Sequence, residues 1–254
     1  MKILFILPAL VFLQCENVNK NTKGSHSNHL PMRIHHCNLR MCPNEQEMDL
    51  YQHEDVYDSN PFIDSTSIGD KGRYKIEIRA VHLNNFEDSL YLKLFKKKNG
   101  DWDCLQRASE YSDWPFYFSP NFEDFNKDGW NDLTLITGDA ARASNVVQTL
   151  FIFDPKKERF ITIRNSKKYP NLRYNSALDC IDAWLVYGGS SSVFLRLSGD
   201  SLIEFAKVSH DDLSRNVYLI DEKGNRKLLE STQLKEDCYT RYCNYNPVEV
   251  CSEW

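Results

Sequence analysis

The chain has 254 residues, of which 41% are hydrophobic and 26% charged, and its formal net charge is −5 at pH 7. This length suffices for one β domain of ordinary size together with a short N-terminal segment. The negative charge and the lack of any basic block argue against a nucleic-acid partner.

The N-terminus has the pattern of an export signal. Met1 and Lys2 precede an apolar run from Ile3 to Leu13, which is too short to span a bilayer. Residues 1–14 are therefore predicted to be a signal peptide. Cys15 at the processing point is typical of a bacterial lipoprotein, so we expect acylation of Cys15 and an exported, membrane-anchored protein, periplasmic or on the cell surface. The alternative is an ordinary export signal, because Phe12 and Gln14 replace the residues usual in lipoprotein signals.

A polar segment without periodicity follows and is predicted to be a flexible tether over residues 15–31. Residues 32–70 form an N-terminal segment whose structure the sequence does not define, although Glu45 to Val56 is compatible with a short helix. Residues 71–254 are expected to form the folded domain.

Seven cysteines follow Cys15, and export makes disulfides the default. The odd number leaves one thiol unpaired or in an intermolecular bond. Cys37 and Cys42 are one candidate pair, and two of Cys238, Cys243 and Cys251 are another. The spacings do not match a zinc site.

Period-two alternation dominates the folded part. Tyr74, Ile76 and Ile78 share one face of a predicted strand over 73–81, and Leu90, Leu92 and Leu94 alternate in the same way. Asn99-Gly100 predicts a type I′ hairpin into a strand over 101–106. Further strands are predicted over 115–118, 132–137, 146–154, 159–163, 183–187, 193–197, 202–208, 217–221 and 227–231. Many short strands with polar turns predict an all-β, antiparallel domain, either propeller-like or a sandwich or barrel.

The segment from Asp124 to Asp132 reads D-x-N-x-D-G-x-x-D. It places oxygen side chains in the order that an EF-hand-type loop uses to bind Ca²⁺, with a glycine at the turn. The predicted ligands are Asp124, Asn126, Asp128, the carbonyl of Trp130, and Asp132. Leu135 stands where a bidentate glutamate is usual, so a further ligand must come from elsewhere or from water. The alternative is a turn whose side chains cap their own backbone.

Two loops of small residues are candidates for binding a partner. One spans residues 138–145 and the other 187–192. Small residues allow a loop to enter a narrow cleft, and Arg142 can pair with carboxylates through two parallel hydrogen bonds. The alternative is that both loops are ordinary hairpin connections.

Catalytic signals are weak. A glycoside hydrolase needs two carboxylates at a fixed separation, and the sequence does not fix the separation of the acidic candidates Glu110, Asp113 and Glu123. No activated serine or cysteine motif is present. We therefore expect a protein that is not an enzyme.

The calcium loop, the following Leu150-Phe151-Ile152-Phe153-Asp154 run, Tyr169-Pro170-Asn171-Leu172 and the Gly188-Gly189-Ser190 turn together resemble a family of bacterial exported lipoproteins. The likeness covers roughly residues 115–210, and the loop by itself also resembles the calcium loops of FG-GAP repeats. The resemblance implies a propeller-like β domain with one calcium loop. It also implies an inhibitor of lysozyme-like peptidoglycan hydrolases, serving as an immunity protein or in defence against host lysozyme.

In that interpretation a loop enters the cleft of the hydrolase and hydrogen-bonds its catalytic carboxylates. The candidate contacts are Arg142, Asn145, Tyr187, Ser190 and Ser191. The alternative function is a surface or periplasmic adhesion or ligand-binding module in which calcium is purely structural.

Overall fold

The computed structural model describes residues 57–58, 60–83, 87–113, 118–211, 213–235 and 239–251. All of them belong to one compact unit, which spans residues 37–254. The signal peptide, Cys15, the tether, the Cys37–Cys42 pair and the helix expected over 45–56 lie outside the described residues, and the predictions made for them stand as predictions.

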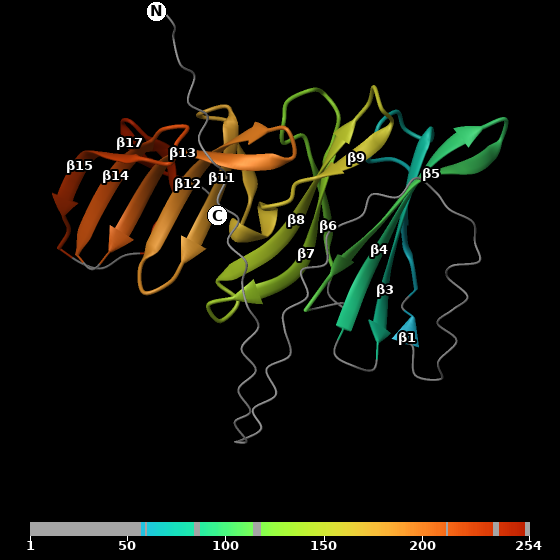
Figure 1. Cartoon of the computed structure of the whole chain (residues 1–254), viewed down its shortest axis with the longest axis horizontal. Coiled ribbons are helices and arrows are strands. Elements are labelled where there is room, and N and C mark those ends of the chain that lie inside the picture. The colour runs from blue at the N-terminus through green and yellow to red at the C-terminus, as the bar shows by residue number, and fades with distance from the viewer. Residues whose placement is uncertain are drawn as a thin grey trace, which may run out of the picture. The chain divides into compact units, whose positions relative to one another are not determined.

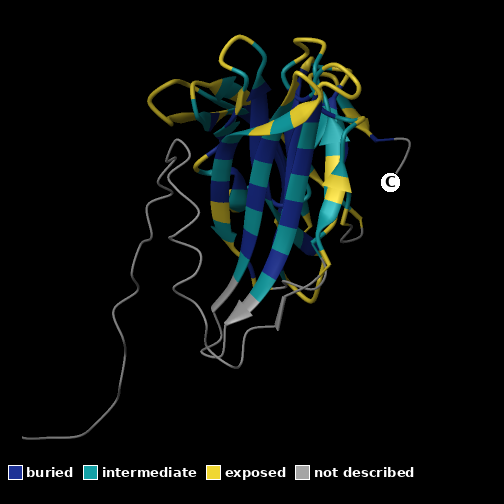
Figure 2. Ribbon diagram, turned by 90° about the vertical axis from the view of Figure 1, so that its right-hand side faces the viewer, coloured by how far each residue is buried: buried dark blue, intermediate teal, exposed yellow. Residues whose placement is uncertain are grey.

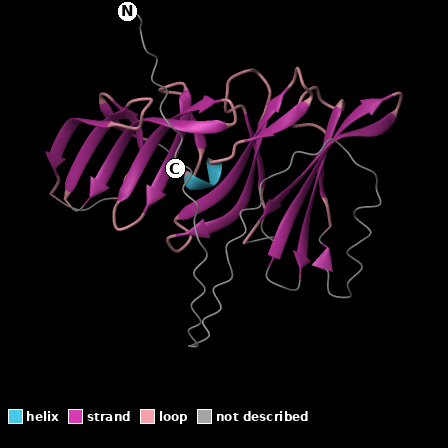
Figure 3. Cartoon of the chain, viewed as in Figure 1, coloured by secondary structure: helices cyan, strands magenta, loops and turns pink. Residues whose placement is uncertain are grey.

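The described strands form four antiparallel sheets (Figures 1 and 3). Sheet A contains β1 (Tyr57–Asp58), β2 (Phe62–Asp64), β3 (Tyr74–Leu83), β4 (Glu87–Lys98) and β5 (Asp101–Tyr111). Sheet B contains β6 (Pro120–Glu123), β7 (Asp132–Ala140), β8 (Asn145–Asp154) and β9 (Arg159–Thr162). Sheet C contains β10 (Arg173–Asn175), β11 (Cys180–Val186), β12 (Ser190–Ser198), β13 (Ser201–Asp211), β14 (Ser214–Ile220) and β15 (Arg226–Gln233). A short hairpin of β16 (Tyr242–Tyr245) and β17 (Val248–Val250) forms the fourth sheet, and η4 (Ser166–Lys168) is a single 3₁₀ turn.

This architecture confirms the all-β, antiparallel prediction, and none of the sheets built from the described strands closes on itself. The type I′ turn is also confirmed, because Asn99 and Gly100 have φ values of 53° and 99°. Two details differ from the sequence prediction. β1 and β2 pair with β3, so strands begin before residue 71, and β6, which begins at Pro120, is not among the predicted strands. The strand expected over 115–118 lies almost wholly outside the described residues and stays a prediction.

Sheet B contributes to the core from both of its faces. Phe151 and Phe153 pack in one cluster with residues of β3 and β4 from sheet A. Leu150 and Ile152, whose side chains alternate with them, pack with Ile181 and other residues of sheet C. Burial on both faces explains why β8 has a continuous apolar run over residues 150–153, whereas β3 alternates; Figure 2 shows alternation of this kind as stripes of buried and half-buried residues.

Carboxamide side chains join the sheets by completing pairs of backbone hydrogen bonds. Gln106 of β5 donates to the carbonyl of Phe160 at 3.0 Å and accepts from its amide at 2.7 Å, which links sheet A to sheet B. Asn165 makes the same pair of bonds to Leu202, both at 2.8 Å. Each amide satisfies a backbone donor and an acceptor that strand pairing leaves open.

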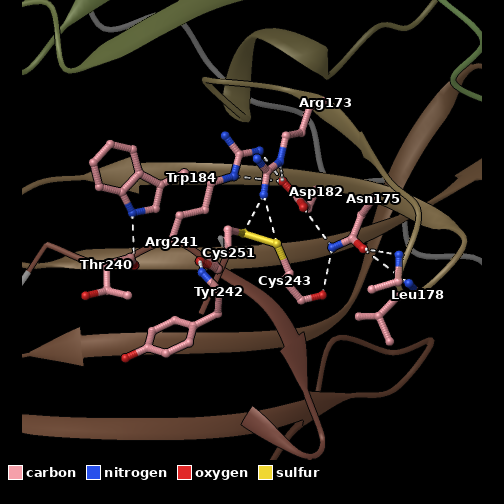
Figure 4. The surroundings of a disulfide bond; sticks show 12 residues. Arg173, Asn175, Leu178, Asp182, Trp184, Thr240, Arg241, Tyr242, Cys243 and Cys251 are labelled. Atoms are coloured by element: carbon pink, nitrogen blue, oxygen red, sulfur yellow. Dashed lines mark hydrogen bonds and ion pairs between the residues drawn. A yellow bond between two sulfur atoms is a disulfide. The ribbon is translucent and has the colours of Figure 1, made fainter. Parts of the chain in front are cut away.

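The C-terminal hairpin is fixed to sheet C by a buried ionic cluster (Figure 4). A disulfide joins Cys243 to Cys251, which confirms that two of the three C-terminal cysteines pair. Asp182 is fully buried and forms ion pairs with Arg173 and Arg241. Because both cations and hydrogen bonds are present, the buried carboxylate is compensated, and breaking one pair would leave a buried charge.

Candidate functional site

The β6–β7 loop, residues 124–131, folds onto its own backbone amides. Asp124 accepts hydrogen bonds from the amides of Asp128 at 3.2 Å and Gly129 at 3.0 Å. Asn126 accepts from the same Asp128 amide at 3.1 Å, and Asp128 accepts from the amide of Trp130 at 2.9 Å. Gly129 has a φ of 91°, which favours glycine at the turn. These bonds draw the side chains of loop positions 1, 3 and 5 toward the inside of the loop.

Asp132, the last residue of the loop motif, lies at the start of β7 and is fully buried. Its two oxygens accept hydrogen bonds from the amides of Phe125 and Phe153, both at 2.9 Å. Burial, together with the smaller effect of the charges on Asp128 and Asp124, raises the pKa of Asp132 to about 7 despite these two hydrogen bonds. No cation among the described residues forms an ion pair with this carboxylate. It is therefore a buried negative charge for which the described chain supplies no counter-charge.

The donor set fits a calcium ion. Carboxylates, an amide oxygen and a backbone carbonyl are the hard oxygen ligands that Ca²⁺ takes, and an ion would supply the charge that Asp132 lacks. In this structure the carboxylates bind the loop's own amides, and no three His, Cys, Asp or Glu residues of the described chain are arranged to hold a metal. Asp124, Asn126, Asp128, the Trp130 carbonyl and Asp132 are the residues that would hold the ion, and its contribution there would be structural.

The second candidate region is the β7–β8 turn, residues 141–144. Ala141, Arg142 and Ala143 have φ values of 51°, 57° and 65°, so three successive residues with side chains are in the left-handed region. This conformation costs about 1–2 kcal/mol per residue and persists only where the surroundings enforce it. Arg142 is exposed at the tip of the turn.

Two asparagines hold the base of this turn. Asn171 donates to the carbonyl of Ser144 at 2.9 Å and accepts from the amide of Val146 at 3.1 Å. Asn145 donates to the carbonyl of Val186 at 2.7 Å and accepts from its amide at 2.8 Å. Since Val186 ends β11, Asn145 ties the Arg142 turn directly to the β11–β12 turn, which is the other loop singled out in the sequence.

The structure assigns different positions to the five candidate contacts. Arg142 is exposed and Tyr187 is 43% exposed, but Asn145, Ser190 and Ser191 are buried. The hydroxyl of Tyr187 lies 2.5 Å from that of Ser191 and donates to Asp211 at 3.2 Å, so the tyrosine is fixed in place. The exposed pair is thus available to a partner, whereas the buried residues support the two turns.

Gly189 has a packing role in the second turn. A Cβ atom at this position would lie 2.0 Å from the carbonyl oxygen of His210. The small residues of this turn therefore allow close approach to β13 within the chain itself.

The calcium loop and the Arg142 turn lie at opposite ends of β7. The strand runs from Asp132 to Ala140, and at about 3.3 Å per residue its two ends are about 26 Å apart. An ion held in the loop would therefore lie about one strand length from the Arg142 turn.

The three acidic residues considered as a hydrolase pair make different contacts in the structure. Glu110 forms an ion pair with Lys167 at 2.9 Å. Glu123 is half-buried, and burial raises its pKa. Asp113 is exposed, and its amide donates to the carbonyl of Thr137 at 2.9 Å.

Three amide residues that join the sheets were not predictable as such from the sequence: Gln106, Asn165 and Asn171. Each is a polar amide in or beside an apolar strand, and an exposed amide has the same local sequence pattern.

No helix among the described residues has the length and apolar character needed to cross a membrane. No protein-family model and no curated protein matches the chain. Among solved structures, it is similar to a chain described as a Xanthomonas type IV secretion system related protein. The two are 10% identical with a TM-score of 0.43, and the alignment covers 70% of this chain and 100% of the other. A likeness at this level carries no argument about function.

Proposed function

We propose that this protein is an exported, calcium-stabilised lipoprotein that binds and inhibits a lysozyme-like peptidoglycan hydrolase. The observation that supports the proposal most is the Arg142 turn. The exposed guanidinium of Arg142 belongs to a turn whose backbone conformation is costly to form. The side chains of Asn145 and Asn171 hold the flanks of this turn by hydrogen bonds. Strain of this kind, maintained by surrounding structure, is common where a loop serves recognition.

The chemistry of the partner suits this arrangement. Lysozyme-like hydrolases act through a pair of carboxylic residues in a cleft. A guanidinium can bind such carboxylates with two parallel hydrogen bonds. Tyr187, on the β11–β12 turn that Asn145 joins to the Arg142 turn, offers a partly exposed aromatic ring held by hydrogen bonds. Because the turn is already ordered, it loses little conformational entropy on binding.

The test is protection of bacterial cell walls. The purified protein is mixed with muramidases, including any that is encoded beside it, and the clearing of a peptidoglycan suspension is followed. We expect slower clearing with the wild type, and a loss of at least tenfold in potency for Arg142→Ala. Lys223→Ala, which removes a positive charge from another exposed turn, serves as the matched control and should inhibit as the wild type does. If the wild type protects against none of these enzymes, the proposal fails.

A further inference from the structure

On the outer face of sheet A, lysine and arginine residues outnumber acidic residues. Along β3 and β4, the buried residues Ile76, Ile78, Leu92 and Leu94 point into the core. The register therefore places the alternating residues of β3, β4 and β5 on the opposite face. We call this the basic face, and its charged residues with described side chains are Lys75, Glu77, Arg79, Lys93, Lys97 and Arg107.

Two lysines of the basic face surround one indole ring. The Nζ atom of Lys75 lies 5.1 Å from the ring centroid of Trp102, and that of Lys97 lies 5.7 Å from it. Lys75 also lies 4.3 Å from the ring of Phe95. No carboxylate of the described chain forms an ion pair with Lys75 or Lys97, so the two ammonium groups repel each other and attract any anion that approaches.

Glu77 does not neutralise the basic face. Glu77 lies 3.1 Å from Arg79 and 3.9 Å from Lys93, so it is shared between two cations. Arg107 is opposite Lys93 in the register of β4 and β5. The register also places Asp58 and Glu87 on this face, so its five cations exceed its three carboxylates by two, on a protein whose net charge is −5.

The arrangement of these cations points to an extended ligand. Side chains on neighbouring strands of one face are about 5 Å apart and those on alternate residues about 7 Å apart, so the charges form an array and do not converge on one point. The rings of Phe95 and Trp102 are covered by lysines, which leaves little aromatic surface for stacking bases or sugars. Ile63, which is 57% exposed, pairs with Glu77 at the margin of the face and adds an apolar side chain.

We propose that the basic face binds the anionic headgroups of a membrane surface. A bilayer presents phosphate charges over a plane, which matches a sheet face carrying parallel cations. The predicted lipid anchor favours a bilayer over other polyanions, because it would hold the domain close to one. This contact is independent of hydrolase binding, since it uses sheet A and not the turn that carries Arg142.

The experiment measures sedimentation with vesicles, using the chain without its first 15 residues so that no lipid anchor contributes. Vesicles of phosphatidylcholine are compared with vesicles in which about a third of the lipid is phosphatidylglycerol. We expect binding only to the anionic vesicles, and a steep loss of binding as salt rises from about 0.1 M to 0.5 M. A lysine near an anionic surface contributes about fivefold to the partition coefficient. Lys75→Gln/Lys93→Gln/Lys97→Gln should therefore bind at least tenfold more weakly.

The control variant is Lys168→Gln/Lys223→Gln/Lys227→Gln, which removes the same charge from exposed positions elsewhere and should bind as the wild type does. Circular dichroism verifies that both triple variants are folded, and Lys97→Glu alone replaces the first variant if that one does not fold. Equal binding by the two variants overturns the proposal. So does wild-type binding to a soluble acidic polysaccharide such as dextran sulfate without binding to anionic vesicles. Failure to inhibit a hydrolase would leave this result untouched.

Discussion

The substitution Asp132→Asn tests whether a metal ion compensates the negative charge of the buried carboxylate. Asp132 is fully buried and accepts the amides of Phe125 and Phe153. Burial raises its pKa to about 7, against 3.8 for an exposed aspartate. Without a cation the ionised side chain therefore destabilises the fold. Asparagine has nearly the same shape, keeps one of the two hydrogen bonds and carries no charge.

The direction of the pH dependence follows from the raised pKa. A proton on Asp132 favours the folded state, so this stabilisation is fully present below about pH 4 and is lost as the pH rises through about 7. The shift corresponds to at most about 4 kcal/mol. In the variant one buried amide is left without an acceptor, which costs about 1–3 kcal/mol. In chelator at pH 8 we thus expect Asp132→Asn to be more stable than the wild type by about 2 kcal/mol, an advantage that disappears below pH 5.

Calcium should reverse this order. An ion present at 100 times its dissociation constant stabilises the wild type by about 2.7 kcal/mol, and the variant loses part of that binding energy together with a ligand. The assay is urea unfolding of both proteins at pH 5 and pH 8, in chelator and in calcium. Asp139→Asn, on the same strand but outside the loop, controls for the loss of a negative charge. If Asp132→Asn is equally destabilising with and without calcium, the two amides alone satisfy Asp132 and the argument for the ion is wrong.

Three further predictions use the same unfolding assay. In chelator, Asp128→Ala should change the free energy of unfolding by less than about 1 kcal/mol, because the Asp128 carboxylate is exposed. The same substitution should abolish the stabilisation gained on adding calcium, and an undiminished calcium response would exclude Asp128 as a ligand. Gln106→Leu leaves the buried amide and carbonyl of Phe160 without partners and should cost about 2–4 kcal/mol, whereas a loss under about 0.5 kcal/mol would show that the bridge between sheets A and B is dispensable. Changing Cys243 and Cys251 to serine opens a loop with a sequence separation of 8 and should lower the free energy of unfolding by about 2–3 kcal/mol. Dithiothreitol should lower the stability of the wild type to that of the double variant, whose own stability should not change.

The sheets were largely predictable because their sequence pattern has a direct physical cause. Where one face of a strand is buried and the other is not, as in β3, apolar and polar residues must alternate. The hairpin between β4 and β5 was predictable because few residue pairs other than Asn99-Gly100 tolerate two positive φ values in succession. The C-terminal disulfide was predictable only as a pairing among three cysteines.

The connections between sheets were not predictable. Gln106, Asn145 and Asn171 act through backbone groups that are distant in sequence, and nothing in their local sequence distinguishes them from exposed amides. β10, β16 and β17 contain three or four residues each, which is too few to show a period. The basic face was hidden for a related reason. Its residues Lys75 and Lys93 alternate with core residues along β3 and β4, and the short run Lys96-Lys97-Lys98 is divided between the two faces of the sheet, with Lys96 paired to Glu158.

The two candidate sites lie at opposite ends of β7, so a change at one of them can be tested for its effect on the other. The calcium loop precedes Asp132 and the Arg142 turn follows Ala140, about 26 Å away. Asn145 and Asn171 hold the turn against sheet C without any contact to the loop. Well below its melting temperature, calcium-free protein should therefore inhibit the hydrolase within about twofold of the calcium-bound protein. The Arg142→Ala variant should inhibit the hydrolase more weakly than the wild type, while calcium should raise its melting temperature as much as it raises that of the wild type. A tenfold dependence of inhibition on calcium at a temperature where both forms are folded would mean that β7 transmits the state of the loop to the turn.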